Sequence, residues 1–346
     1  MSTALHRNPF HVLGATPQDS GARLRELADE RALIADPAAC QKACADLMSP
    51  RTRLSAELGW LPGVASSQAM LALEWLDRPA EKTFCHELPP LARANLAAAE
   101  IERTVSPLAG AEAVRRIVDL AFTLDGIDLQ TLVRELNADR SVAGVPQLPN
   151  AEAIAVELES QRRYYKRIVR DLLDRLPTRE MILVVSEAAD RCTEGGTRPA
   201  PRLVQDLGDT YELEAQAFVA GEAANIDRLI ARAQAEAMRG DSRLLATIDA
   251  LGNVAANWTL VMKPMQVLRR GNGIDHPASG AVAARMRSLA IWLCNERRMI
   301  EASRRIIAFL RREFNALIEL SARLDEDASQ IARISIAPSA SGPRSA

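Results

Sequence analysis

Residues 151–176 read AEAIAVELESQRRYYKRIVRDLLDRL, and their apolar side chains recur at intervals of three and four positions. This spacing places them on one stripe of an α-helix, because a helix completes one turn in about 3.6 residues. The stripe consists of Ile154, Leu158, Tyr165, Ile168, Val169, Leu172, Leu173 and Leu176. We therefore expect a long amphipathic helix with one buried face.

Helical periodicity extends over most of the chain. Residues that favour helices dominate, and only 4% of residues are aromatic. The strand-like run Met181–Val185 is interpreted as the buried face of a helix. The sequence therefore predicts an all-α fold. Beyond residue 63 the expected helices are 66–77, 90–104, 107–124, 129–139, 151–176, 179–192, 202–220, 223–239, 242–268, 279–297 and 300–334.

Glycine and proline interrupt the helical pattern strongly at two places. The first is Leu58–Gly63, and the second is Cys192–Pro201, which holds two glycines and two prolines. Both stretches are candidate domain boundaries. The predicted division is a helical module at 1–63, helical domains at 64–200 and 201–335, and a disordered tail at 336–346.

The composition is that of a folded globular chain, with 48% hydrophobic and 25% charged residues. The 43 basic and 45 acidic residues nearly cancel, so gross charge does not indicate a nucleic-acid or anionic-membrane protein. No apolar run approaches a membrane span in length, and residues 1–7 lack the apolar region of a signal peptide. We expect a cytoplasmic protein with no membrane partner.

Residues that carry catalytic or metal chemistry are few and scattered. Cys40 and Cys44 share a helix face, but no second pair follows, so buried thiols are favoured over a metal site. Cys85-His86-Glu87 is interpreted as a loop or helix end, and Asp275-His276-Pro277 as a turn before a helix. We expect no metal, no cofactor and no catalytic residue. An enzyme whose site is assembled from His86, Glu87, Asp275 and His276 remains the alternative.

The first 58 residues follow a distinctive order of helix starts and stops. Asn8-Pro9-Phe10-His11-Val12-Leu13-Gly14 predicts a short helix that ends at glycine. A second helix is expected to start at Thr16-Pro17, with Thr16 as its N-cap and Pro17 at its first position, and it must end before Pro37. A third begins at Ala39 and leads to Leu47-Met48-Ser49-Pro50-Arg51-Thr52-Arg53.

This pattern resembles the J domain of the DnaJ co-chaperone family over residues 8–58, because that family opens with an Asn-Pro-aromatic-x-x-Leu-Gly run and closes with a Leu-Ser-Asp-Pro-x-x-Arg run, whose proline and arginine correspond to Pro50 and Arg53. The resemblance implies a small helical module that contacts an Hsp70 ATPase. One departure is decisive, since the His-Pro-Asp tripeptide of the family falls on Asp36-Pro37-Ala38. The family uses that tripeptide to trigger ATP hydrolysis, so the resemblance implies a J-like module without the trigger. The second helix also lacks the family's strongly basic face.

A local basic run, Arg162-Arg163-Tyr164-Tyr165-Lys166-Arg167, allows two interpretations. Guanidinium groups and rings together favour phosphates and stacked bases, whereas a solvated helix face is the simpler account. Arginine pairs at 269–270, 297–298, 304–305 and 311–312 would extend a basic surface if the fold aligned them. The predicted partner-binding residues are Pro9, Phe10, Asp36, Pro37, Arg162, Arg163, Tyr164, Lys166 and Arg167.

The segments 289–296 and 300–306 resemble a tetratricopeptide-type helix pair, with small Ala290 and Ala302 at the contact. No clear recurrence at that repeat's period of about 34 residues is present, so we expect stacked helical hairpins of a degenerate, repeat-like kind. Such stacks present grooves to proteins. The predicted function is a non-enzymatic adaptor or co-chaperone-like protein whose partner is an Hsp70-like ATPase or a protein of the same operon. The alternative is a nucleic-acid-associated protein.

Overall fold

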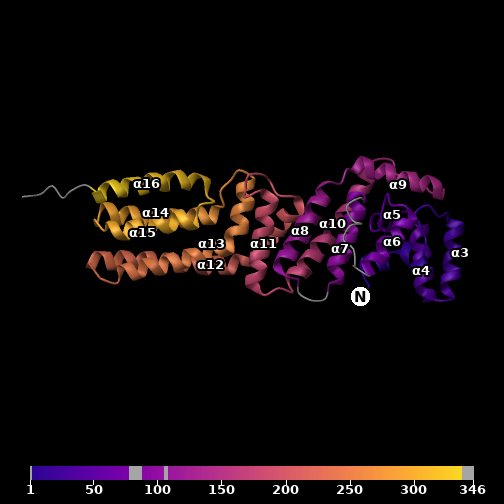
Figure 1. Ribbon diagram of the computed structural model, residues 1–346, viewed down its shortest axis with the longest axis horizontal. Coiled ribbons are helices and arrows are strands. Elements are labelled where there is room, and N and C mark those ends of the chain that lie inside the picture. The colour runs from indigo at the N-terminus through magenta and orange to yellow at the C-terminus, as the bar shows by residue number, and fades with distance from the viewer. Residues whose placement is uncertain (1, 78–87, 105–107, 337–346) are drawn as a thin grey trace, which may run out of the picture. The chain divides into compact units, whose positions relative to one another are not determined.

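The computed structural model describes residues 2–77, 88–104 and 108–336, with side chains as far as Arg333. Within these ranges the chain is helical and contains no strand, so the all-α prediction is confirmed (Figure 1). The chain forms two compact units. The first comprises Met1–Val184 with Pro201–Leu203, and the second comprises Val185–Ala200 with Val204–Ala346.

The first unit begins with short helices whose ends follow from their sequence. Asn8 caps α2, because its side chain accepts a hydrogen bond from the Phe10 N–H, and Pro9 occupies the first turn. Gly14 ends α2 with φ of 66°, a backbone conformation that glycine adopts without strain. The helices of this part are α1 (Ala4–Arg7), α2 (Pro9–Leu13), α3 (Gly21–Ala32), α4 (Pro37–Met48) and α5 (Pro50–Leu58).

Longer helices follow in the first unit. They are α6 (Ser66–Asp77), α7 (Pro90–Arg103), α8 (Gly110–Asp125), α9 (Leu129–Ala143), α10 (Glu152–Leu173) and the first part of α11 (Thr178–Thr193). Of these, α7 packs against α1 and α10 packs against α5. Helix α7 also packs against α8 and α10 (Figure 1). The predicted stripe of α10 is buried along its length, including Tyr165, which is 0% exposed. The expected helix at residues 181–185 is confirmed as part of α11.

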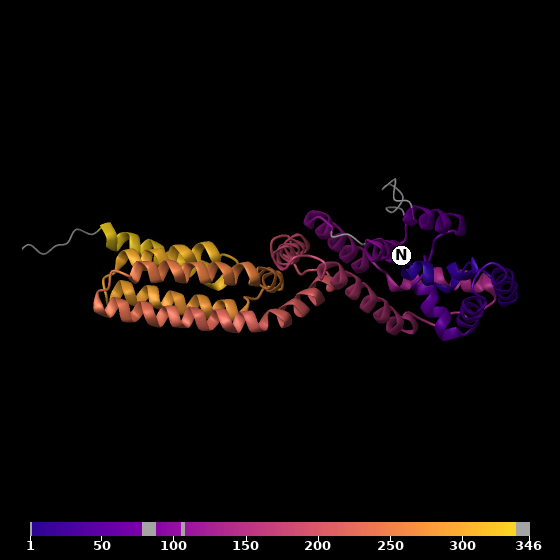
Figure 2. The same cartoon turned by 90° about the horizontal axis from the view of Figure 1, so that it is seen from below.

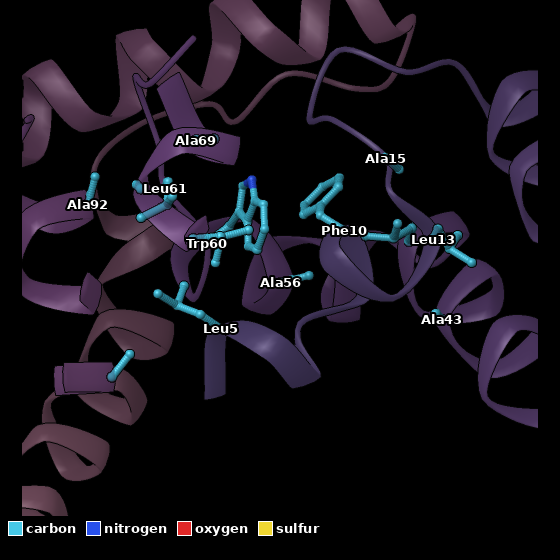
Figure 3. Close-up of a cluster of buried hydrophobic side chains, with 14 of the residues drawn as sticks. Leu5, Phe10, Leu13, Ala15, Ala43, Ala56, Trp60, Leu61, Ala69 and Ala92 are labelled. Atoms are coloured by element: carbon cyan, nitrogen blue, oxygen red, sulfur yellow. The ribbon is translucent and has the colours of Figure 1, made fainter. Parts of the chain in front are cut away.

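One hydrophobic core runs across the boundary that the sequence predicts after residue 63. Figure 3 shows Phe10 beside Trp60, with ring centroids 6.2 Å apart, and the same cluster includes Ala69 of α6 and Ala92 of α7. Asn95 of α7 donates hydrogen bonds to the carbonyl oxygens of Leu58 and Trp60 at 2.8 and 2.6 Å. Residues 1–63 therefore share their core with α6 and α7, within one compact unit.

The second unit consists of the end of α11, α12 (Arg202–Arg239), α13 (Leu244–Gly271), α14 (Pro277–Asn295), α15 (Ile300–Glu313) and α16 (Ile318–Ile336). Helices α12, α14, α15 and α16 lie side by side (Figures 1 and 2). Residues 194–201 separate α11 from α12, so the second predicted helix break is confirmed.

Two helix boundaries in this unit differ from the prediction. Helix α12 continues through the expected break near Gly221, where an added Cβ would meet only open space. The expected single helix over 300–334 is instead two helices. The Asp275 carboxylate accepts hydrogen bonds from the N–H groups of Ile318 and Glu319, which starts α16 after the fully buried Phe314.

Helix α13 is the one helix in the described ranges that is long and apolar enough to cross a membrane by length and composition, with 39% of the apolar window buried. It packs against α15, and a Cβ added at Gly252 would lie 2.6 Å from the ring of Phe309. Its Trp258 indole N–H donates to Ser279 of α14 at 3.0 Å. These contacts are those of a core helix of the second unit.

Candidate partner-binding site

The opening residues of the J-like segment divide into a buried and an accessible part. Phe10 is 0% exposed and packs beneath the Arg53 guanidinium, 5.9 Å from its ring centroid. This burial corrects the expectation that Phe10 contacts a partner, because its ring is already enclosed by the core. Pro9 is half-buried and lines a cleft of the first unit.

The predicted residues Asp36 and Pro37 lie at the tip of the hairpin formed by α3 and α4. The Asp36 carboxylate caps α4, since it accepts a hydrogen bond from the Ala38 N–H at 3.1 Å, and Pro37 begins that helix. Just before them, Leu33 is 85% exposed and Ile34 is 78% exposed. We call these four residues the hairpin tip. It combines two large, adjacent, solvent-exposed apolar side chains with a rigid helix start.

The basic run of α10 is only partly available to a ligand. Arg162 pairs with Glu159, and that carboxylate also pairs with Arg202 at 2.8 Å. Arg167 stacks over the Tyr164 ring at 5.6 Å from its centroid, and Arg163 is exposed. Lys166 is half-buried. The face is therefore a mixture of internal pairs and solvated side chains.

A polar cleft of about 420 Å³ joins residues that are far apart in the sequence. Of the predicted binding residues it contains Pro9 and Tyr164, whereas the hairpin tip and the four basic residues of α10 are not among its lining. Its walls consist of Ala4, Leu5, Asn8, Pro9, Lys42, Asp46, Thr52, Ser55, Ala56, Gly59, Asn95, Glu157, Ser160, Gln161 and Tyr164.

Electrostatics at one wall of this cleft fix the Tyr164 side chain. Its hydroxyl donates to the Glu102 carboxylate at 3.0 Å. Burial raises the pKa of Glu102, but hydrogen bonds from Arg7, the Ala4 N–H and Tyr164 outweigh burial, so its net pKa is lowered. Burial and the Glu102 charge raise the pKa of Tyr164, which therefore stays a neutral donor. No histidine or cysteine is among the residues that line this cleft, and its polar side chains supply hydrogen-bond donors and acceptors.

The second unit contains a serine, histidine and carboxylate in hydrogen-bond contact. His276 Nδ1 lies 2.9 Å from the Ser279 hydroxyl oxygen, and its Nε2 lies 3.3 Å from Glu212. Ser279 is 0% exposed and also accepts hydrogen bonds from Trp258 and Gln266. The buried hydroxyl therefore links α13 to the start of α14, and His276 connects it to Glu212 of α12. His276 caps α14, which confirms the predicted turn before that helix.

The other residues considered for chemistry give no site in the part of the chain that the structure describes. No group of three or more histidine, cysteine or acidic side chains is placed to hold a metal there. Cys40 is buried and Cys44 partly buried, both as free thiols. Cys85, His86 and Glu87 lie outside the described residues, as does the tail from residue 337.

Five of the eight arginines in the predicted pairs of the second unit form ion pairs, whereas no carboxylate partner among the described residues is shown for Arg270, Arg297 or Arg298. The carboxylate partners are Glu212 for Arg269, Glu301 for Arg304, Asp249 for Arg305, Asp325 for Arg311 and Glu313 for Arg312. Each pair cancels locally the positive charge that phosphate binding requires. No observation among these contacts favours the nucleic-acid alternative.

Two bulky residues of the hairpin tip, Leu33 and Ile34, were not among the predicted binding residues. The sequence contains no clear signal for them. Ile34 follows Leu27, which packs against the core, by seven positions, and this helical spacing predicts a buried side chain rather than an exposed one. Comparisons with models of known protein families, with curated proteins and with solved structures found no match to this chain.

Proposed function

We propose that this chain is a non-enzymatic, cytoplasmic adaptor that recruits a protein partner through the tip of the α3/α4 hairpin. The observation that carries the proposal is the adjacent pair Leu33 and Ile34, 85% and 78% exposed at the tip. Their exposed fractions exceed those of the other adjacent exposed apolar pair in the described residues, Met70 and Leu71, at 53% and 52%, and a partner that covers the tip would remove both side chains from water. Asp36 and Pro37 hold the tip in place by starting α4.

The energetics fit a specific but moderate interaction. Burying an aliphatic side chain of this size contributes about 1.5–3 kcal/mol, so the pair supplies roughly 3–6 kcal/mol before the costs of association. The remaining affinity must come from neighbouring contacts. The polar cleft around Pro9 and Tyr164 is a second accessible feature of the same unit, and its hydrogen-bonding groups suit an extended polar segment of a partner.

The preferred partner is an Hsp70-like ATPase, with a protein of the same operon as the other candidate. The resemblance to J domains supports this choice, and the hairpin of α3 and α4 carries Asp36-Pro37-Ala38 where that family has its trigger. The Asp36 carboxylate is already used in capping α4. We therefore expect binding to such an ATPase without stimulation of ATP hydrolysis.

The helical body supplies a scaffold for this recruitment. Helices α14 and α15 pack closely through the small, buried Ala290 and Ala302, and the Ser303 hydroxyl donates to the Ala290 carbonyl oxygen at 2.8 Å. This pairing supports a stacked-hairpin, tetratricopeptide-like role for the second unit. The proposal assigns partner recruitment to the tip and rigid support to the body.

The test measures binding of the purified Hsp70-like ATPase of the host to the full chain by biolayer interferometry, and ATP turnover in parallel. The variant L33S/I34S should weaken binding by about tenfold or more, since it removes most of the apolar contact. The control V142S/V156S replaces two exposed aliphatic side chains outside the tip, which are 67% and 80% exposed, and it should bind like wild type.

Three outcomes contradict parts of the proposal. If L33S/I34S and V142S/V156S bind the ATPase equally well, the hairpin tip is not the binding site. Stimulated ATP turnover contradicts the loss of the trigger. Binding to a DNA or RNA oligonucleotide that weakens steeply with salt, without binding to protein, would establish the nucleic-acid alternative. The test uses point variants because a deletion of residues 1–63 would expose the core that those residues share with α6 and α7.

A further inference from the structure

Three charged side chains form a buried cluster between α5 and α9. Arg53 Nε donates to Glu57 Oε1 at 2.9 Å, while Arg140 donates to Glu57 Oε2 from Nε at 2.9 Å and from Nη2 at 2.7 Å. The residues are 3%, 2% and 5% exposed, respectively. A single carboxylate thus serves two arginines, and the cluster carries one uncompensated positive charge.

Carbonyl oxygens complete the hydrogen bonding of the arginines without balancing that charge. Arg53 donates to the carbonyl oxygens of Pro17 and Leu47, and Arg140 donates to that of Pro146. A carbonyl carries no net charge, so the imbalance remains. Buried charges in proteins are normally paired, because an isolated ion loses its hydration without compensation. The cluster therefore favours an anion at close range.

Both arginines border a cavity of about 210 Å³. No acidic side chain lines it in the described residues, so the lining holds two positive charges and no negative charge. The other walls are largely apolar. The full lining is Gly21, Leu47, Met48, Pro50, Arg53, Arg140, Ala143, Gly144, Val145 and Pro146.

We infer that this cavity binds a carboxylate carried on a short apolar group. The arginines would donate charge-assisted hydrogen bonds to the carboxylate oxygens, and Met48 and Val145 would enclose the apolar part. A cavity of this size exceeds the space of a single water several-fold, so it admits a small organic acid. A small aliphatic acid fits this size, as does a carboxyl-terminal residue with a small apolar side chain. The inference does not rest on partner recruitment by the hairpin tip.

The experiment is isothermal titration of the full chain with pentanoate at low ionic strength, beside its neutral isostere pentanamide. Pentanoate should bind saturably and pentanamide should not. The variant R140Q leaves Arg53 paired one-to-one with Glu57, so it should fold, and it should weaken pentanoate binding by about tenfold or more. Circular dichroism checks that the variant is folded.

Two further variants separate the cavity from general effects. V145F fills the cavity while keeping both arginines, and it should also lose pentanoate binding. R202Q removes one of the two arginines that share Glu159 outside the cavity, and it should bind like wild type. Absence of saturable pentanoate binding, equal binding of pentanamide, or unchanged binding by R140Q and V145F would overturn the inference.

Peptide arms identify the source of the carboxylate. The peptide acetyl-Gly-Gly-Val is titrated with a free and with an amidated carboxyl end. Tighter binding of the free-acid peptide than of pentanoate assigns the cavity to a protein carboxyl terminus. Binding of pentanoate alone assigns it to a small free acid, and both results support the inference.

Discussion

The substitution E57Q tests how much the buried cluster of Arg53, Glu57 and Arg140 stabilises the first unit. It removes the only carboxylate of the cluster, and the new amide NH₂ must face a guanidinium donor. All three side chains are at least nine-tenths buried, so water cannot solvate the two arginines once the carboxylate charge is gone. Removing one partner of a buried pair costs about 3–5 kcal/mol. At about 2–4 °C per kcal/mol for a unit of this size, the melting temperature should fall by roughly 6–20 °C.

The assay is differential scanning calorimetry of the full chain, in which the transition of the first unit should move and that of the second should stay. The matched control is E159Q, because Glu159 also lies between two arginines, Arg162 and Arg202, but its side chain is 39% exposed. That substitution should cost at most about 1 kcal/mol. Equal losses for E57Q and E159Q would refute the reasoning that burial makes the cluster costly to break.

Three further predictions concern the core, a helix contact and a titrating group. F10A should destabilise the first unit by about 3–5 kcal/mol in urea unfolding, because it empties a fully enclosed site beside Trp60. G252A should cost about 1–3 kcal/mol because its Cβ would lie 2.6 Å from the Phe309 ring, whereas G221A, in open space, should stabilise α12 by about 0.5–1 kcal/mol. Burial lowers the pKa of His276 in the folded chain, although the nearby Glu212 carboxylate acts in the opposite direction. The neutral imidazole therefore stabilises the fold above the unfolded-state pKa of about 6.5, and this stabilisation is lost as the pH falls toward the folded-state pKa. Calorimetry of wild type and H276N between about pH 5 and 8 should show a difference in midpoint that shrinks as the pH is lowered, and a constant difference would contradict the assignment.

Local sequence signals predicted most helices, because the capping residues, prolines and glycines that start and end a helix lie within a few positions of its ends. Asn8-Pro9 and Gly14 bound α2, and the apolar stripe of α10 is buried as expected. The misplaced boundaries have causes outside the local sequence. The start of α16 depends on Asp275, which is more than forty positions away. Helix α12 passes Gly221 because a single glycine costs only about 1 kcal/mol in a helix.

The candidate site was predictable in outline but not in detail. The turn at Asp36-Pro37 was placed correctly, whereas partner binding by the half-buried Pro9 stays a prediction. Exposure of Leu33 and Ile34 depends on which side of the hairpin the core covers, and composition does not carry that information. The aromatic side chain of Phe10 is buried in the core and is not accessible to a partner.

The closing motif of the J-like segment also has a structural explanation. Its final arginine, Arg53, is buried, donates to the Leu47 and Pro17 carbonyl oxygens and pairs with Glu57. Sequence alone did not reveal that Arg140 joins this pair, because Arg140 lies 83 positions from Glu57 along the chain. The charge imbalance at the cavity therefore became visible only in three dimensions.

Site-specific photocrosslinking tests the central claim, recruitment through the hairpin tip, most directly. Photoreactive benzoylphenylalanine replaces Ile34 in the full chain, expressed in its native host, and a second chain carries it in place of Val156, which is 80% exposed on α10. After irradiation, adducts are identified by mass spectrometry. The account predicts one abundant protein adduct, an Hsp70-like ATPase or an operon-encoded protein, from position 34 alone. No adduct at position 34, or the same adducts from both positions, would contradict it.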